Sequence, residues 1–168
     1  FTVAPVVRPA DAKTAGAKYD GLIYHNFARE KIDENGCLTG IELLPPENFN
    51  FGYDVVDALA RKCPDKRAML WLSRDKEERD FTFAEISALS NRTANYFASL
   101  GIGKGDRVML VLKRHYQFWL SILALHKLGA VAIPATSLLV RHDYEYRFEA
   151  AQVKAIVCTG DGECAAEV

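Results

Sequence analysis

The sequence "SLGIGKGDRVMLVL", residues 99–112, places three glycines and a lysine directly before an apolar run. A phosphate-binding loop has a similar composition, but there the glycines precede a helix whose positive end faces the anion. Here residues 82–101 carry apolar side chains at spacings of three and four, which predicts a helix before the glycines. Gly105 also follows Lys104 where a Walker loop needs a hydroxyl residue. We therefore interpret the segment as a turn between a helix and a strand.

The predicted helix carries its own start and stop signals. Thr82 and Glu85 have the T-x-x-E spacing of a capping box. Gly101 is placed to end the helix, because glycine enters the left-handed conformation without a steric penalty. The following run "RVMLVL", residues 107–112, is continuously apolar after its first residue, which predicts a strand buried on both faces.

The rest of the pattern predicts an α/β fold. Residues 52–65 indicate a helix that stops at Pro64, and residues 67–83 indicate a β-hairpin around a charged turn. Beyond residue 112, helices and strands alternate: helix 114–128, strand 130–136, helix 142–152 and strand 154–159. Alternation of this kind is typical of a parallel sheet with flanking helices, to which the hairpin is appended. The helix over 114–128 is apolar on nearly all sides, so we expect it to lie between two layers.

The N-terminal quarter of the chain has a weaker pattern. Residues 1–45 are interpreted as an N-terminal arm and linker, and residues 46–168 as an incomplete α/β subdomain. Within the arm, residues 22–31 predict a short helix and residues 34–36 a turn.

Composition narrows the classes of partner. The net charge of -1 gives no basic field for extended contact with nucleic acid or an anionic membrane. The longest apolar stretch, residues 118–125, is far shorter than the ~20 residues that cross a bilayer. The four cysteines lack a C-x-x-C pair and are too sparse for a disulfide scaffold, and no secretory signal pattern is present. We expect a small-molecule or protein partner, reduced thiols and a cytoplasmic location.

Most residues that could carry chemistry have a structural interpretation. His115 and His126 lie at opposite ends of one predicted helix, too far apart to share a metal ion or a proton. Cys158 ends a predicted strand without an activating neighbour in sequence, so we expect a buried small residue. An acidic cluster in the predicted hairpin is expected to be solvated: Glu77, Glu78 and Asp80. No catalytic or metal-binding residue is predicted.

The position of one segment favours a role in ligand binding. The sequence "PATSLL", residues 134–139, follows a predicted strand of the parallel sheet. Open α/β sheets bind ligands beyond the carboxyl ends of their strands. Thr136 and Ser137 are therefore placed where a ligand would dock.

Four stretches, in their order, resemble the N-terminal portion of the AMP-forming acyl-CoA synthetases, and most closely the medium-chain branch of this adenylate-forming superfamily. They are residues 46–71, 80–112, 123–139 and 143–161. One departure stands out, because many relatives carry proline after the "VML-VL"-type strand, where this chain has Lys113 and Arg114. The departure leaves the local loop shape undetermined by the resemblance, and it does not affect the resemblance itself.

The resemblance implies an acid–thiol ligase that activates a carboxylic acid, of the fatty acid class, with ATP and transfers it to coenzyme A. ATP, Mg²⁺ and coenzyme A would be its cofactors, and Thr136 and Leu138 its candidate coenzyme A contacts. The family's phosphate loop and adenylate-forming lysine would lie further along than this chain reaches. The chain also begins with Phe1, so we expect an N-terminal part that is inactive alone and that needs the remainder of the same polypeptide as its partner.

Two alternatives remain open from the sequence. The α/β pattern also suits a self-contained flavodoxin-like binding or regulatory module. A member of the superfamily that adenylates an acid without coenzyme A is the other alternative, and the "PATSLL" segment favours the coenzyme A branch over it.

Overall fold

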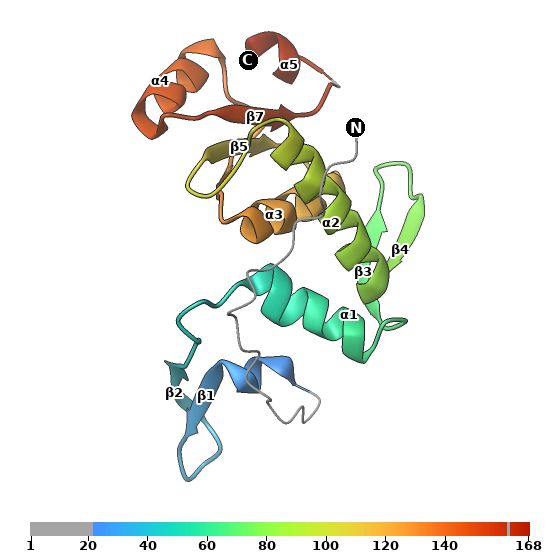
Figure 1. The fold of residues 1–168 in the computed structure, drawn as a ribbon, viewed down its shortest axis with the longest axis vertical. Coiled ribbons are helices and arrows are strands. Elements are labelled where there is room, and N and C mark those ends of the chain that lie inside the picture. Colours follow the sequence, from blue (N-terminus) through green and yellow to red (C-terminus); the bar gives the residue numbers. More distant parts are fainter. Residues whose placement is uncertain (1–21, 161) are drawn as a thin grey trace.

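The computed structural model describes residues 22–160 and 162–168, and it shows an α/β fold built around three separate sheets (Figure 1). In chain order the elements are η1 (Ile23–Asn26), β1 (Ala28–Ile32), β2 (Leu38–Leu43), η2 (Phe51–Asp57), α1 (Ala58–Lys62), β3 (Arg67–Leu72), β4 (Glu78–Thr82), α2 (Phe83–Ser99), β5 (Arg107–Val111), α3 (Gln117–Leu128), β6 (Val131–Pro134), α4 (Arg141–Ala151), β7 (Ala155–Cys158) and α5 (Cys164–Glu167). The predicted parallel sheet with flanking helices and an appended hairpin is confirmed.

The central sheet has the order β6-β5-β7, and all of its pairs are parallel. Strand β5 is buried on both faces. Val108 and Leu110 pack with residues of α2 and α3, whereas Met109 and Val111 pack on the opposite face with residues of α4 and α5. Figure 1 shows the same layering, with α4 and α5 on one side of the strands and α2 and α3 on the other. The continuous apolar run therefore reflects burial from two sides, as predicted.

The glycine-rich segment is a structural turn, as predicted. The Thr82 hydroxyl accepts a hydrogen bond from the Glu85 amide at 3.2 Å, and the Glu85 carboxylate accepts from the Thr82 amide at 2.8 Å, which completes the capping box. Gly101 has a φ of +82° just beyond α2. The Asp106 carboxylate then accepts from the Gly103 amide, and the Gly105 amide donates to the Gly129 carbonyl, so these two amides bond within the fold and are not presented to an anion.

Helix α3 lies between two layers, as predicted. Ala124 and Leu125 face the central sheet. Leu120 and Leu123 face a second apolar cluster, to which η2, β4 and α2 contribute Val56, Phe81 and Ile86. Helix η2 is a π-helical turn that leads directly into α1, so the helix predicted over 52–65 begins at Phe51 and ends at Lys62, before Pro64.

The β3–β4 hairpin is anchored to the loop before α3. The Trp71 indole N–H donates to the Arg114 carbonyl at 2.7 Å. The Arg79 guanidinium lies over the Tyr116 ring at 4.8 Å and donates to the Tyr116 hydroxyl. These contacts hold the hairpin beside the carboxyl end of β5.

The prediction for residues 22–31 needs a correction. The expected short helix is confined to the single 3-10 turn η1, and its second half belongs to β1, which pairs antiparallel with β2. The turn expected at residues 34–36 is confirmed, because Gly36 has a φ of +80° and the Asp33 carboxylate accepts from the amides of Asn35 and Cys37. Pairing with a partner strand overrode a weak local helical preference.

Candidate functional site at the carboxyl end of the parallel sheet

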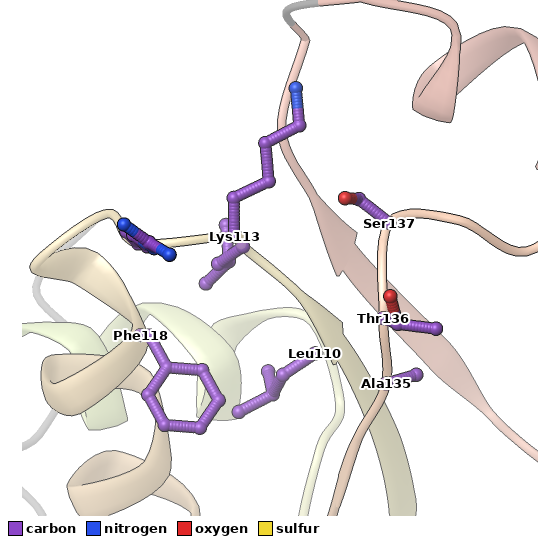
Figure 2. A pocket seen from close by; sticks show the side chains of 8 residues that line it. Leu110, Lys113, Phe118, Ala135, Thr136 and Ser137 are labelled. Atoms are coloured by element: carbon purple, nitrogen blue, oxygen red, sulfur yellow. The ribbon is translucent and has the colours of Figure 1, made fainter. Parts of the chain in front are cut away.

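A hollow of about 310 Å³ lies between the loops that follow β5 and β6. Its floor is apolar and includes Leu110 and Phe118, whereas Thr136 and Ser137 contribute hydroxyls from the loop after β6 (Figure 2). The sequence positions this loop because β6 ends at Pro134, and the chain then runs over the sheet edge towards α4. The segment "PATSLL", which was predicted to face a ligand, thus contributes two residues to the lining of a hollow.

Lys113 lies at the rim of this hollow. Its φ is +47°, a left-handed value that the ring of proline cannot adopt. Lys113 thus gives this loop a backbone conformation that a proline at the same position would not allow. Figure 2 shows the Lys113 side chain extending past Ser137 and away from Phe118. Its ammonium reaches the next loop of the sheet edge, where a Cβ built on Gly162 would lie 3.5 Å from Nζ.

The two predicted contact residues belong to adjoining hollows. Thr136 lines the first hollow, and its hydroxyl accepts weakly from the Leu138 amide at 3.3 Å. Leu138 is 85% exposed and lines a second hollow of about 370 Å³ that runs to α5. Lys113 and Ser137 line both hollows, so the two form one continuous surface along the sheet edge.

The charges on this surface are mixed. Lys113 and Arg114 bring positive charge to the first hollow, and Glu163 and Glu167 bring negative charge to the second. Apolar floor, hydroxyls and cations together suit a ligand that has both apolar and anionic parts. In residues 22–160 and 162–168, no cluster of three or more His, Cys, Asp or Glu residues could hold a metal ion.

The other residues considered from sequence are not brought together at this edge. His126 lies in the last turn of α3, whereas His115 precedes α3 and has its Nε2 3.5 Å from the Thr159 hydroxyl. The acidic cluster is exposed on the hairpin, as expected: Glu77, Glu78 and Asp80. Cys158 is half-buried, and burial, followed by the neighbouring Cys164, raises the pKa of its thiol.

Sequence reasoning missed the most completely buried charge in the described chain. The Lys127 ammonium donates to Asp57 Oδ1 at 2.7 Å, to Ser90 Oγ at 2.9 Å and to Asn91 Oδ1 at 2.7 Å. Its side chain is fully buried. Burial lowers the pKa of Lys127, while the hydrogen bond to Asp57 acts in the opposite direction. The only signal in the sequence was a lysine in an otherwise apolar helix, and a lysine in a last turn has an ordinary explanation in the helix dipole.

Known proteins have similar sequences. The profile of the "AMP-binding enzyme" family matches residues 56–168. Acyl-coenzyme A synthetase ACSM5, mitochondrial, from Rattus norvegicus is 38% identical over 118 residues, which cover 67% of this chain and 20% of that protein. The chain therefore spans about a fifth of the length of this relative.

Solved structures show the same fold. The Mycobacterium tuberculosis fatty acyl CoA synthetase aligns with a TM-score of 0.58 and 29% identity, covering 64% of this chain and 20% of that one. A benzoate CoA ligase from Burkholderia xenovorans LB400 aligns with a TM-score of 0.61 and 22% identity, covering 71% of this chain and 23% of that one. The second likeness concerns the fold alone. The similarity to acyl-CoA synthetases predicted from the sequence is confirmed.

Proposed function

Because this chain belongs to the AMP-binding enzyme family, we propose that it is the N-terminal part of a ligase that joins a carboxylic acid to coenzyme A. The whole protein would use ATP and Mg²⁺ to form an acyl-adenylate, release pyrophosphate and transfer the acyl group to the coenzyme A thiol. The observation that carries this proposal is the family match over residues 56–168, together with the identity to a relative named as an acyl-coenzyme A synthetase. This match favours the ligase over a self-contained flavodoxin-like module.

A fatty acid is the substrate class that we propose. The support is the 29% identity to a solved fatty acyl CoA synthetase, in addition to the ACSM relatives. The described residues contain no metal cluster, and the sequence holds no phosphate loop, so the groups that grip ATP would come from the remainder of the polypeptide.

The contribution of this chain would be one wall of the coenzyme A site. Thr136 and Leu138 are proposed as contacts because they lie on the continuous surface at the carboxyl edge of the sheet. The pantetheine arm of coenzyme A alternates methylene and amide groups. An apolar floor with hydroxyls at its side offers both packing and hydrogen bonds to such an arm.

The activity is tested by comparing the full gene product with the 168-residue chain. With ATP, Mg²⁺, coenzyme A and a series of fatty acids, the gene product should release AMP and pyrophosphate and form a thioester. The chain alone should form no acyl-adenylate, because positioning and charge stabilisation of the phosphates need groups that it lacks. Turnover by the chain alone would refute the N-terminal assignment. A gene product that adenylates acids without forming thioesters would favour the branch that does not use coenzyme A.

The wall is tested with Leu138→Asp in the active gene product. The substitution places a carboxylate instead of an apolar side chain beside the pantetheine arm, which should raise the KM for coenzyme A on the order of tenfold, equivalent to about 1.4 kcal/mol of binding. The KM for ATP should stay unchanged. Tyr146→Ala is the matched control, because Tyr146 is 70% exposed on α4 and lines neither hollow. Equal effects of both variants on coenzyme A would remove Leu138 from the site.

The compartment stays a prediction. Within the described residues no helix is long and apolar enough to cross a membrane. All four cysteines are free thiols in the structure. The rat relative is named as mitochondrial, so a cytoplasmic location is not supported by that relative. Fractionation of cells that express the tagged gene product would decide between the two locations.

A further inference from the structure

Two cysteines meet at the end of the central sheet. Cys158 is the last residue of β7 and is half-buried, whereas Cys164 is the first residue of α5 and is only 4% exposed. They pack in one apolar cluster with Met109 and Tyr144. Cys164 also contributes to the raised pKa of the Cys158 thiol, which agrees with two side chains that lie near each other in this cluster.

Neighbouring residues restrain the chain around the two thiols. The Thr159 amide donates to the Val111 carbonyl at 3.1 Å, which fixes the chain directly after Cys158 to the central strand. The Tyr144 hydroxyl lies 3.5 Å from Cys164 Sγ. Gly160 and Gly162 stand in the short connection between the cysteines, and Gly162 has a φ of +72°. Glycines in this connection allow the small backbone adjustment that disulfide geometry requires.

We propose that Cys158 and Cys164 form a reversible intramolecular disulfide when the protein meets a two-electron oxidant such as hydrogen peroxide. The less buried Cys158 sulfur attacks one peroxide oxygen, breaks the O–O bond and becomes a sulfenic acid while water leaves. Cys164 Sγ then attacks the Cys158 sulfur, the S–S bond forms and a second water leaves. Two thiols are oxidised, one peroxide is reduced to two waters, and a thiol reductant reverses the step.

The reaction is expected to be slow. The thiolate is the nucleophilic form of cysteine, and burial raises the pKa of the Cys158 thiol. Burial likewise raises the pKa of Tyr144, so its hydroxyl stays protonated beside Cys164. The site is therefore suited to a sustained oxidising condition and not to rapid catalysis.

The disulfide between Cys158 and Cys164 would fix α5 to the end of β7. The Glu167 carboxylate of α5 accepts from the Arg141 amide at 2.7 Å, which joins α5 to the start of α4. Glu163, Cys164 and Glu167 also line the hollow that contains Leu138. The disulfide would thus restrain one side of that hollow. Its formation does not depend on the ligase proposal.

The experiment uses tryptic mapping of the unmodified protein. Trypsin cleaves after Lys154, and residues 155–168 contain no further lysine or arginine, so one peptide carries Cys158 and Cys164 and neither of the other cysteines. After hydrogen peroxide treatment and alkylation, this peptide should be two hydrogen atoms lighter than the reduced peptide and should take up no alkylating reagent. Dithiothreitol added before alkylation should restore uptake of two alkyl groups.

Variants identify the partners. Cys158→Ser and Cys164→Ser should each abolish the lighter peptide, and Cys63→Ser, the matched control, should leave it unchanged. The result on the unmodified protein holds even if Cys164→Ser fails to fold. A peptide that stays fully reduced, or that carries separate sulfinic or sulfonic acids, would overturn the proposal. A disulfide that joins residues 155–168 to Cys37, to Cys63 or to a second chain would also overturn it.

Discussion

Helix α3 borders two interiors of opposite chemistry. On the sheet side, Ala124 and Leu125 are fully buried among apolar side chains of α2 and β5. On the other side, beyond the second apolar cluster around Leu120 and Leu123, the last turn of α3 buries the Lys127 ammonium among oxygen atoms of Asp57, Ser90 and Asn91. The three N–H donors of the ammonium have three acceptors, so the buried charge is paired and hydrogen bonded. The difference teaches that one helix can pack by apolar contacts along most of its length and by directed hydrogen bonds at its last turn.

The polar interior around Lys127 also holds helix η2 in place. Asp57 ends η2 and accepts a further hydrogen bond from the Ser87 hydroxyl at 2.7 Å. The Asn50 side-chain amide donates to the His126 carbonyl at 2.6 Å. A Cβ on Gly52 would lie 2.9 Å from Cγ of Lys127, so the backbone of η2 approaches this lysine more closely than any other residue type would allow. Residues far apart in sequence are thus held together by Lys127 and its neighbours.

The largest effect on the free energy of unfolding is expected when the ion pair between Lys127 and Asp57 is removed. Lys127→Met keeps the length of the side chain but leaves the buried Asp57 carboxylate without its cation. Removing one partner of a buried ion pair costs about 3–5 kcal/mol of the free energy of unfolding. Urea unfolding followed by circular dichroism would measure it. Lys66→Met, at an exposed position, is the control and should change this free energy by less than about 0.5 kcal/mol. Equal midpoints for both variants would show that the ion pair stabilises nothing.

The contrast between the two interiors explains what sequence could predict. The capping box at Thr82, the glycine turn and β5 were predictable because each signal lies within a few residues. The apolar side of α3 was predictable because its period is helical. Lys127 was not, since its acceptors come from η2 and α2, and no local pattern indicates that they converge. Strands β1 and β2 were missed for a related reason, because their charged residues hide the alternation and only their mutual pairing defines them.

At the candidate site the same limit applies. The position of Thr136 at a sheet edge followed from the order of elements along the chain. The backbone conformation at Lys113 and the packing of Cys158 and Cys164 into one cluster involve segments that are brought together only by the folded sheet. The sequence marked Lys113 and Arg114 as a departure from the family pattern, but the sign of φ at Lys113 required the structure.

An intermediate effect on stability is expected for a double variant that removes both charges of the ion pair. Asp57→Leu combined with Lys127→Met turns the centre of the polar interior into an apolar contact. Each single change leaves one charge buried alone, whereas the double change leaves none. The double variant should therefore be more stable than the sum of the single effects predicts, by about 1–2 kcal/mol. A complete double-mutant cycle in urea measures this coupling. Strict additivity would mean that Asp57 and Lys127 act independently, in spite of their 2.7 Å contact.

The smallest effect on stability is expected at His126. It lies next to Lys127, but no hydrogen bond among the described residues offsets the burial of its Nδ1. Its Nδ1 is buried without a hydrogen-bond partner among the described residues, and burial lowers its pKa from the usual 6.5. Below about pH 6.5 the unfolded chain then binds more protons than the folded one, so the free energy of unfolding falls as pH drops and levels off below the folded pKa. His126→Leu removes this titration, and the stability difference between variant and native protein should shift in favour of the variant on acidification. Urea midpoints at about pH 7.5 and 5.5 measure the shift, and parallel changes in both proteins would contradict it. The effect is modest because the side chain is only half-buried, so water still solvates part of the imidazolium, whereas the ammonium of Lys127 depends entirely on protein oxygens.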